Sequence, residues 1–217
     1  MENNDFILQD KINTYLPERT GILLVDPYND FLHHDGKAWP KAKEVAEGVQ
    51  LVKHLAEVVR VARELLIKIF YVPHHRAEPT DYADWKYPTA TQKASHNRQL
   101  FAKGSWGGQF HDDFTPQPGD IVIKEHWAQS GFANTDLDQQ LKQHDIDQII
   151  LIGMLANSCI ESTGRFGMEL GYHVTLVKDA TAAYAWENMH AAHNINGPTY
   201  AHAILTTDEL IKQLKKN

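Results

Sequence analysis

The stretch QIILIGMLANSCIEST, residues 148–163, decides the fold class. Residues 149–152 form a short, mostly β-branched apolar run, which predicts a strand buried on both faces of a parallel sheet. Gly153 ends this run. Ser158, followed three residues later by Glu161, predicts a capping box and a helix that begins at Ser158. The pattern therefore places Cys159 in the first turn of a helix that follows the carboxyl end of a strand.

Cys159 is the single cysteine of the chain. Free amides and the helix dipole at a helix N-terminus favour negative charge, so we expect the thiol pKa to be lowered there. The same amides are able to bind an oxyanion beside the sulfur. The alternative interpretation is a small buried apolar residue.

Length and composition limit the class of protein. The chain has 217 residues, of which 42% are hydrophobic and 23% charged, as in ordinary globular proteins, and we expect one domain over residues 1–217. A net charge of −7 argues against nucleic-acid and anionic-membrane partners. No apolar stretch approaches the length of a membrane span, and the acidic N-terminus lacks a secretory signal. One cysteine permits no internal disulfide, so we expect a cytoplasmic protein.

Strands alternate with helices along the rest of the chain. Further buried-strand runs are expected at residues 21–25, 67–72, 121–123, 174–177 and 203–205, and helices at 40–66, 92–101, 135–143, 186–196 and from Thr206, where Glu209 completes a capping box. This alternation predicts an α/β fold with three α/β/α layers around a mainly parallel, Rossmann-like sheet of about six strands.

Three reactive side chains follow different predicted strands. Asp26, Lys124 and Cys159 each stand at a strand's carboxyl end, the edge at which open α/β sheets bind their ligands. The proline- and glycine-containing connection 73–119 has little periodicity, and its length indicates a lid or a pocket wall.

Four stretches resemble the isochorismatase-like cysteine hydrolases, which include nicotinamidases, carbamoylsarcosine and maleamate amidases and ureidoacrylate hydrolases. The stretches are LVDPYNDF at 24–31, IVIKEH at 121–126 with SGFANT at 130–135, GMLANSCIEST at 153–163 and KDATAA at 178–183. The resemblance covers about residues 20–210.

The resemblance implies a catalytic triad of Asp26, Lys124 and Cys159. It also implies a non-proline cis peptide between Met154 and Leu155, and an oxyanion hole formed by the amides of Leu155 and Cys159. In this scheme Asp26 takes the proton of the thiol, and Lys124 lowers the thiol pKa while keeping Asp26 ionised. The expected product is the acid released by hydrolysis of a thioester intermediate. Candidates for the wall of the substrate pocket are Phe31, Trp106, Trp127 and Phe132.

The sequence departs from the nicotinamidase pattern at its metal site. Residues 71–76 lack the aspartate two positions before a histidine, and the adjacent His74 and His75 should point to opposite sides of an extended segment. We therefore expect no metal and no cofactor.

Three readings of the function remain open. The first is a hydrolase of a small amide, ureido or related carbonyl compound. The second is a metal-assisted nicotinamidase, and the third is a non-catalytic binding module on the same fold. The resemblance also implies a homo-oligomer, a dimer or tetramer. The aromatic residues of the 73–119 connection, which need burial somewhere, agree with this expectation; they are Tyr82, Trp85, Tyr87, Trp106 and Phe110.

Overall fold

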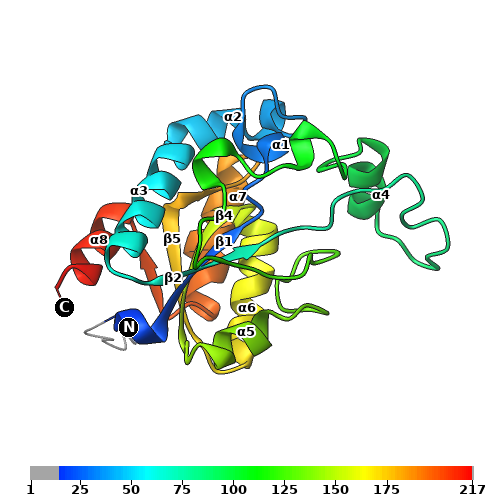
Figure 1. Ribbon diagram of the computed structural model, residues 1–217. Coiled ribbons are helices and arrows are strands. Elements are labelled where there is room, and N and C mark those ends of the chain that lie inside the picture. The colour runs from blue at the N-terminus through cyan, green and yellow to red at the C-terminus, as the bar shows by residue number, and fades with distance from the viewer. Residues whose placement is uncertain (1–14, 217) are drawn as a thin grey trace, which may run out of the picture.

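The computed structural model describes residues 15–216, and a six-stranded parallel sheet forms its centre (Figure 1). In spatial order the strands are β3 (Ile121–Val122), β2 (Lys68–Val72), β1 (Thr20–Val25), β4 (Gln148–Met154), β5 (His173–Ala182) and β6 (Ala203–Leu205). Every neighbouring pair runs parallel. The predicted fold class is confirmed.

Helices cover both faces of the sheet. They are α1 (Asn29–Leu32), α2 (Trp39–Gly48), α3 (Leu51–Glu64), α4 (Ala90–Asn97), α5 (Leu137–Gln143), α6 (Glu161–Glu169), α7 (Trp186–His190) and α8 (Thr207–Leu214). In Figure 1, α2, α3 and α8 lie on one side of the sheet and α5 and α6 on the other. No helix in residues 15–216 has the length and apolar character that crossing a bilayer requires.

Strand β1 shows why its sequence is a continuous apolar run. Ile22 and Leu24 belong to the hydrophobic cluster under α2, α3 and α8, whereas Leu23 and Val25 belong to the cluster under α5 and α6. Successive side chains of a strand point to opposite faces, so a strand covered on both faces needs apolar residues at every position. The same reasoning applies to β4, which is buried from Ile149 onward.

Several helix boundaries differ from the sequence prediction: α4 ends at Asn97, α5 begins at Leu137, and α7 ends at His190. The expected helix over 40–66 is divided into α2 and α3, because Gln50 adopts a left-handed conformation with φ of 52°. Ser158 does not begin a regular helix: it lies inside a π-helical turn, Ala156–Ile160 (η4), and α6 begins at Glu161. The capping box at Thr206 and Glu209 is confirmed. Short 3-10 turns are common at helix ends, whereas π-helical turns are rare and often lie at functional sites.

Candidate active site

Asp26 follows directly on β1 and is fully buried. It adopts a left-handed backbone conformation with φ of 53°, which aspartate tolerates better than most residues. Its N–H donates to the carbonyl of Val72 on β2, at 3.1 Å, and Pro27 then ends the strand. This geometry directs the carboxylate toward the end of the neighbouring strand β4.

Cys159 reaches the same place from β4. The chain leaves β4 through a cis peptide between Met154 and Leu155, as the resemblance implied, and enters the turn η4. The carbonyl of Leu155 accepts hydrogen bonds from the amides of Ser158 and Ile160, at 3.1 and 3.2 Å. The turn holds Cys159 in the lining of the pocket with only 6% of its surface exposed.

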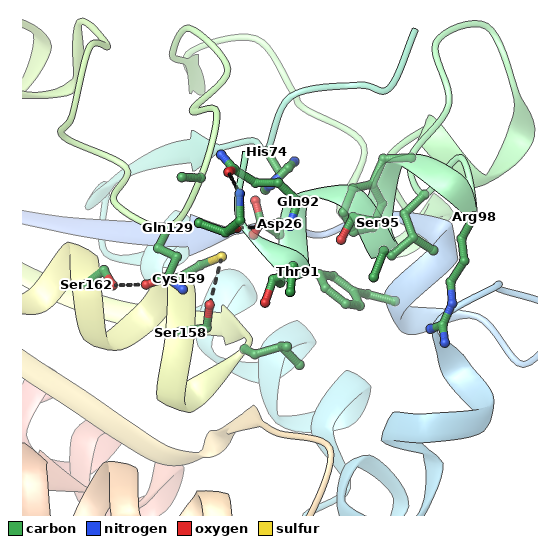
Figure 2. Close-up of a pocket in the computed structure, with 18 of the residues that line it drawn as sticks. Asp26, His74, Thr91, Gln92, Ser95, Arg98, Gln129, Ser158, Cys159 and Ser162 are labelled. Carbon is green, nitrogen blue, oxygen red and sulfur yellow. Dashed lines mark hydrogen bonds between the residues drawn. The ribbon is translucent and has the colours of Figure 1, made fainter. Parts of the chain in front are cut away.

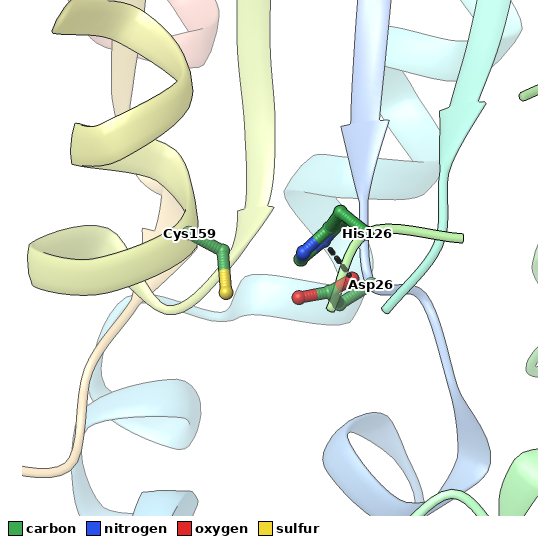
Figure 3. Close-up of side chains that lie close together, drawn as sticks. All are labelled: Asp26, His126 and Cys159. Carbon is green, nitrogen blue, oxygen red and sulfur yellow. Dashed lines mark hydrogen bonds and ion pairs between the residues drawn. The ribbon is translucent and has the colours of Figure 1, made fainter. Parts of the chain in front are cut away.

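The thiol and the carboxylate face one another (Figure 3). The sulfur of Cys159, a carboxylate oxygen of Asp26 and a ring nitrogen of His126 all lie within 4.8 Å of one another. Burial raises the pKa of the Cys159 thiol well above its usual range, and the negative charge of Asp26 raises it further. Hydrogen bonds from Ser158 and the amide of Leu155 act in the opposite direction without outweighing these effects. The expected lowering of the thiol pKa is therefore wrong.

His126 is the third member of this cluster, and the sequence reasoning did not single it out. Its Nε2 donates to Oδ1 of Asp26 at 3.1 Å, and both side chains are fully buried. The other carboxylate oxygen, Oδ2, is also buried and has no partner within ordinary hydrogen-bond distance among the described residues. His126 thus holds one oxygen of Asp26 and leaves the other for the thiol.

A bulge after β3 explains why His126 occupies this place. The N–H of Ile123 donates to the carbonyl of Tyr71, and the N–H of His126 donates to the carbonyl of Pro73. Between these two bonds the chain advances three residues after β3 but only two after β2, so one residue is extra. A regular ladder would continue with an N–H of residue 73 donating to Ile123, but proline has none. The extra residue returns His126 to the buried face on which Ile123 lies.

Lys124 is not brought to the cluster, which corrects the expected triad. It lies on the opposite, exposed side of this segment, and its backbone N–H donates to Oδ1 of Asp136 at 2.7 Å. Ordinary alternation is the physical reason, because the residue directly after the buried Ile123 points to the opposite face, and the bulge then brings His126, not Lys124, back to the buried face. The positive charge of Lys124 faces solvent.

A pocket of about 780 Å³ opens above the thiol (Figure 2). Its floor contains Asp26, Leu155 and Cys159, and His74 and Gln129 stand beside them. The connection 73–119 supplies much of the remaining wall through α4 and the residues around it, which agrees with the predicted role of that segment. Gln129 accepts a hydrogen bond from the Ser162 hydroxyl at 3.1 Å, so its amide is held at the pocket edge.

Among the four aromatic residues expected in the pocket wall, Phe31 lines it and the other three do not. Trp106 is 44% exposed and packs edge-on against His33. Trp127 stacks on His75, with ring centroids 3.6 Å apart. Phe132 is buried in the core under α6, where it stacks on Phe166. Aromatic character alone did not separate pocket residues from core and surface residues.

The cluster has the donor types that bind metal ions. A carboxylate, an imidazole and a thiolate are all ligands for zinc, so Asp26, His126 and Cys159 would hold one if the thiol lost its proton. His74 and His75 diverge as expected: His74 lines the pocket, whereas His75 bonds Asp81 at 2.8 Å. Burial lowers the pKa of His74, which favours its neutral form.

The isochorismatase domain model matches residues 20–209. The chain belongs to the isochorismatase family.

Members of the isochorismatase family that resemble this chain include amidohydrolases. Ureidoacrylate amidohydrolase RutB of Pantoea ananatis is 29% identical over 177 residues, covering 77% of this chain and 70% of that protein. RutB of Azorhizobium caulinodans is 29% identical over 195 residues, covering 84% and 85%.

Solved structures of the family agree. A cysteine hydrolase from Pseudomonas syringae pv. phaseolicola superposes with a TM-score of 0.77 at 25% identity, covering 93% of this chain and 95% of that one. The N-carbamoylsarcosine amidase of Thermoplasma acidophilum gives a TM-score of 0.63 at 27% identity, covering 88% and 98%.

Proposed function

We propose that this isochorismatase-family protein hydrolyses a C–N bond of a non-peptide amide or ureido compound, with Cys159 as nucleophile and Asp26 as general base. The observation that carries the proposal is the buried thiol facing a buried carboxylate within 4.8 Å, at the floor of a pocket. The amidohydrolase relatives support the reaction class.

The high pKa of the thiol makes the neighbouring base necessary. A protonated thiol is a poor nucleophile, so the proton must leave as the sulfur attacks. Oδ2 of Asp26 is free to accept it, because His126 occupies Oδ1. His126 acts as a positioning residue: its hydrogen bond fixes the carboxylate in the orientation that proton transfer needs.

The reaction then divides into two steps. In the first, the sulfur bonds to the substrate carbonyl carbon, the proton moves to Asp26, and the carbonyl oxygen becomes an oxyanion that the amides of Leu155 and Cys159 would stabilise. The intermediate collapses as Asp26 returns the proton to the departing nitrogen, which leaves a thioester. In the second, Asp26 takes a proton from water, the hydroxide adds to the thioester, and the thiol is regenerated with the acid product.

A screen of small amides and ureas for ammonia release tests this function. We expect release by the wild-type protein and none above background by Cys159→Ala, which leaves the fold intact because the side chain is small. Ammonia release that survives Cys159→Ala would show that another group performs the reaction. A wild-type protein that binds compounds from the panel and hydrolyses none of them would favour a binding module.

A metal-assisted reaction is the second candidate, because the same three side chains are zinc ligands within 4.8 Å of one another. It requires the thiolate as a ligand, which would remove the nucleophile. Metal analysis of the purified protein separates the two: one equivalent of zinc or iron, with activity that depends on it, would replace the thioester mechanism.

A further inference from the structure

Two cationic side chains line the pocket away from its floor. Lys41 comes from α2, and Arg98 follows α4. Figure 2 shows Arg98 across the pocket from Cys159, with Thr91 and Ser95 between them. The Nζ of Lys41 lies 5.9 Å from the centre of the Tyr184 ring, and Tyr184 lines the same pocket as both cations.

Neither cation has an acidic partner in the part of the chain that the structure describes. Within residues 15–216 no carboxylate lies within ion-pair distance of Lys41 or Arg98. The acidic residue among the described pocket-lining side chains is Asp26, which lies on the floor beside the thiol. Both side chains are exposed, so in a chain with a net charge of −7 two positive charges without an ion-pair partner among residues 15–216 border one cavity. Such an arrangement attracts an anion.

The size and lining of the pocket indicate how large and how polar the rest of an anionic ligand is. A volume of about 780 Å³ lies in the range of pockets that enclose drug-sized ligands, well above what a very small amide fills. The wall includes apolar side chains, Phe31 and Leu100, and neutral hydrogen-bonding ones, Gln92 and Ser95. This lining suits an uncharged linker between two polar ends.

We propose that the substrate is an elongated amide or ureido compound whose far end carries a carboxylate, which Lys41 and Arg98 bind while the carbonyl group lies at Cys159. The inference rests on the proposed hydrolase function for the reacting end only. A carboxylate is favoured because a guanidinium can bind both of its oxygens with parallel hydrogen bonds. Arg98 and Lys41 are then specificity-determining residues.

The first test measures binding and does not depend on hydrolysis. Suberate, a linear dicarboxylate, is titrated against the rate at which methyl methanethiosulfonate modifies Cys159, and the neutral diol of the same length is titrated in parallel. We expect suberate to protect the thiol far better than the diol. Lys41→Gln and Arg98→Gln should each raise the half-protecting concentration of suberate about tenfold, and the double variant about a hundredfold.

Matched controls come from neighbouring charges. Lys43 lies on the same helix as Lys41 and faces Glu47 at 3.9 Å, and Arg60 on α3 pairs with Glu64. Neither lines the pocket. Lys43→Gln and Arg60→Gln should leave the protection within about twofold of wild type. Equal protection by suberate and the diol, or an unchanged half-protecting concentration in the double variant, would overturn the proposal.

The second test compares turnover of suberamic acid and octanamide, which differ by the terminal carboxylate. We expect a higher kcat/KM for the acid, a ratio that falls about tenfold in each single variant, and a KM for the acid that rises with salt. Similar turnover of both amides would refute the carboxylate site and leave the hydrolase function standing. No turnover of either, with protection by suberate intact, would refute the hydrolase function and leave the site.

Discussion

Replacing Asp26 with asparagine is expected to change the two reactions of Cys159 in opposite directions. Alkylation of the thiol should become faster, because the carboxylate that raises the thiol pKa is gone. Hydrolysis of an amide should be lost, because the proton acceptor is gone. Asparagine also adopts the left-handed conformation of residue 26, where φ is 53°, so the backbone should be preserved.

The geometry sets the size of both effects. Two unit charges separated by the 4.8 Å that bounds this cluster repel one another by about 3–4 kcal/mol at an effective dielectric constant of about 20. Part of the gain in thiolate is offset, because a less basic thiolate is also a weaker nucleophile, so we expect alkylation to accelerate about tenfold. Loss of a general base should lower kcat by about a hundredfold to ten-thousandfold.

The assay is the rate of iodoacetamide incorporation at neutral pH, followed by intact-protein mass spectrometry, beside ammonia release from an amide found in the screen. Asp145→Asn is the matched control, since Asp145 is exposed and shares the left-handed conformation with φ of 57°. Ser158→Ala should slow alkylation, because the hydroxyl that lies 3.9 Å from the sulfur lowers the thiol pKa. An Asp26→Asn protein that is folded and alkylated no faster than wild type would refute the reasoning.

Four further outcomes are expected. His126→Gln should lower kcat at least tenfold, because the carboxylate of Asp26 would no longer be held in place, whereas Lys124→Gln should leave kcat within about twofold. If the ammonia assay showed a larger loss for Lys124→Gln than for His126→Gln, the lysine would belong to the triad. Burial raises the pKa of Glu125, but hydrogen bonds from His75 and Arg76 outweigh it and lower the pKa from 4.5 to about 2. The stability that this lowered pKa contributes is complete above pH 4.5 and is lost as the pH falls toward 2. Glu125→Gln should therefore lower the free energy of unfolding in urea by about 1–2 kcal/mol at neutral pH, a figure discounted for partial exposure, and by less in acid. Exhaustive chelation should leave activity and fold unchanged; loss of activity that zinc restores would contradict this. Light scattering at micromolar concentration should give a multiple of 24.7 kDa, and the monomer mass throughout would argue against a homo-oligomer.

Much of the fold could be predicted because the sheet is buried on both faces. Continuous apolar runs such as 21–25 and 149–152 have few structural alternatives, and each lies within an observed strand. The placement of Asp26 and Cys159 at the same edge followed from that topology. The division of the 40–66 helix at Gln50 was not predicted, since its apolar periodicity continues through the break.

The third member of the cluster was missed because a bulge depends on the neighbouring strand. Counting along residues 121–126 alone gives no reason to place His126 beside Asp26. Pro73, directly after the adjacent strand β2, was the available signal, because a proline there removes the next N–H of the ladder. The thiol pKa was predicted in the wrong direction for a related reason: position in a turn can be read from sequence, but burial beside a carboxylate depends on the tertiary fold.

Trapping the acyl-enzyme tests the central claim most directly. An amide that releases ammonia is mixed with the wild-type protein, quenched in acid within one turnover, and the protein is digested for mass spectrometry. We predict that the peptide containing Cys159 gains the mass of the acyl group, and that this adduct is absent from Cys159→Ser. Steady turnover without any adduct on Cys159, together with full activity of Cys159→Ser, would contradict a thioester mechanism.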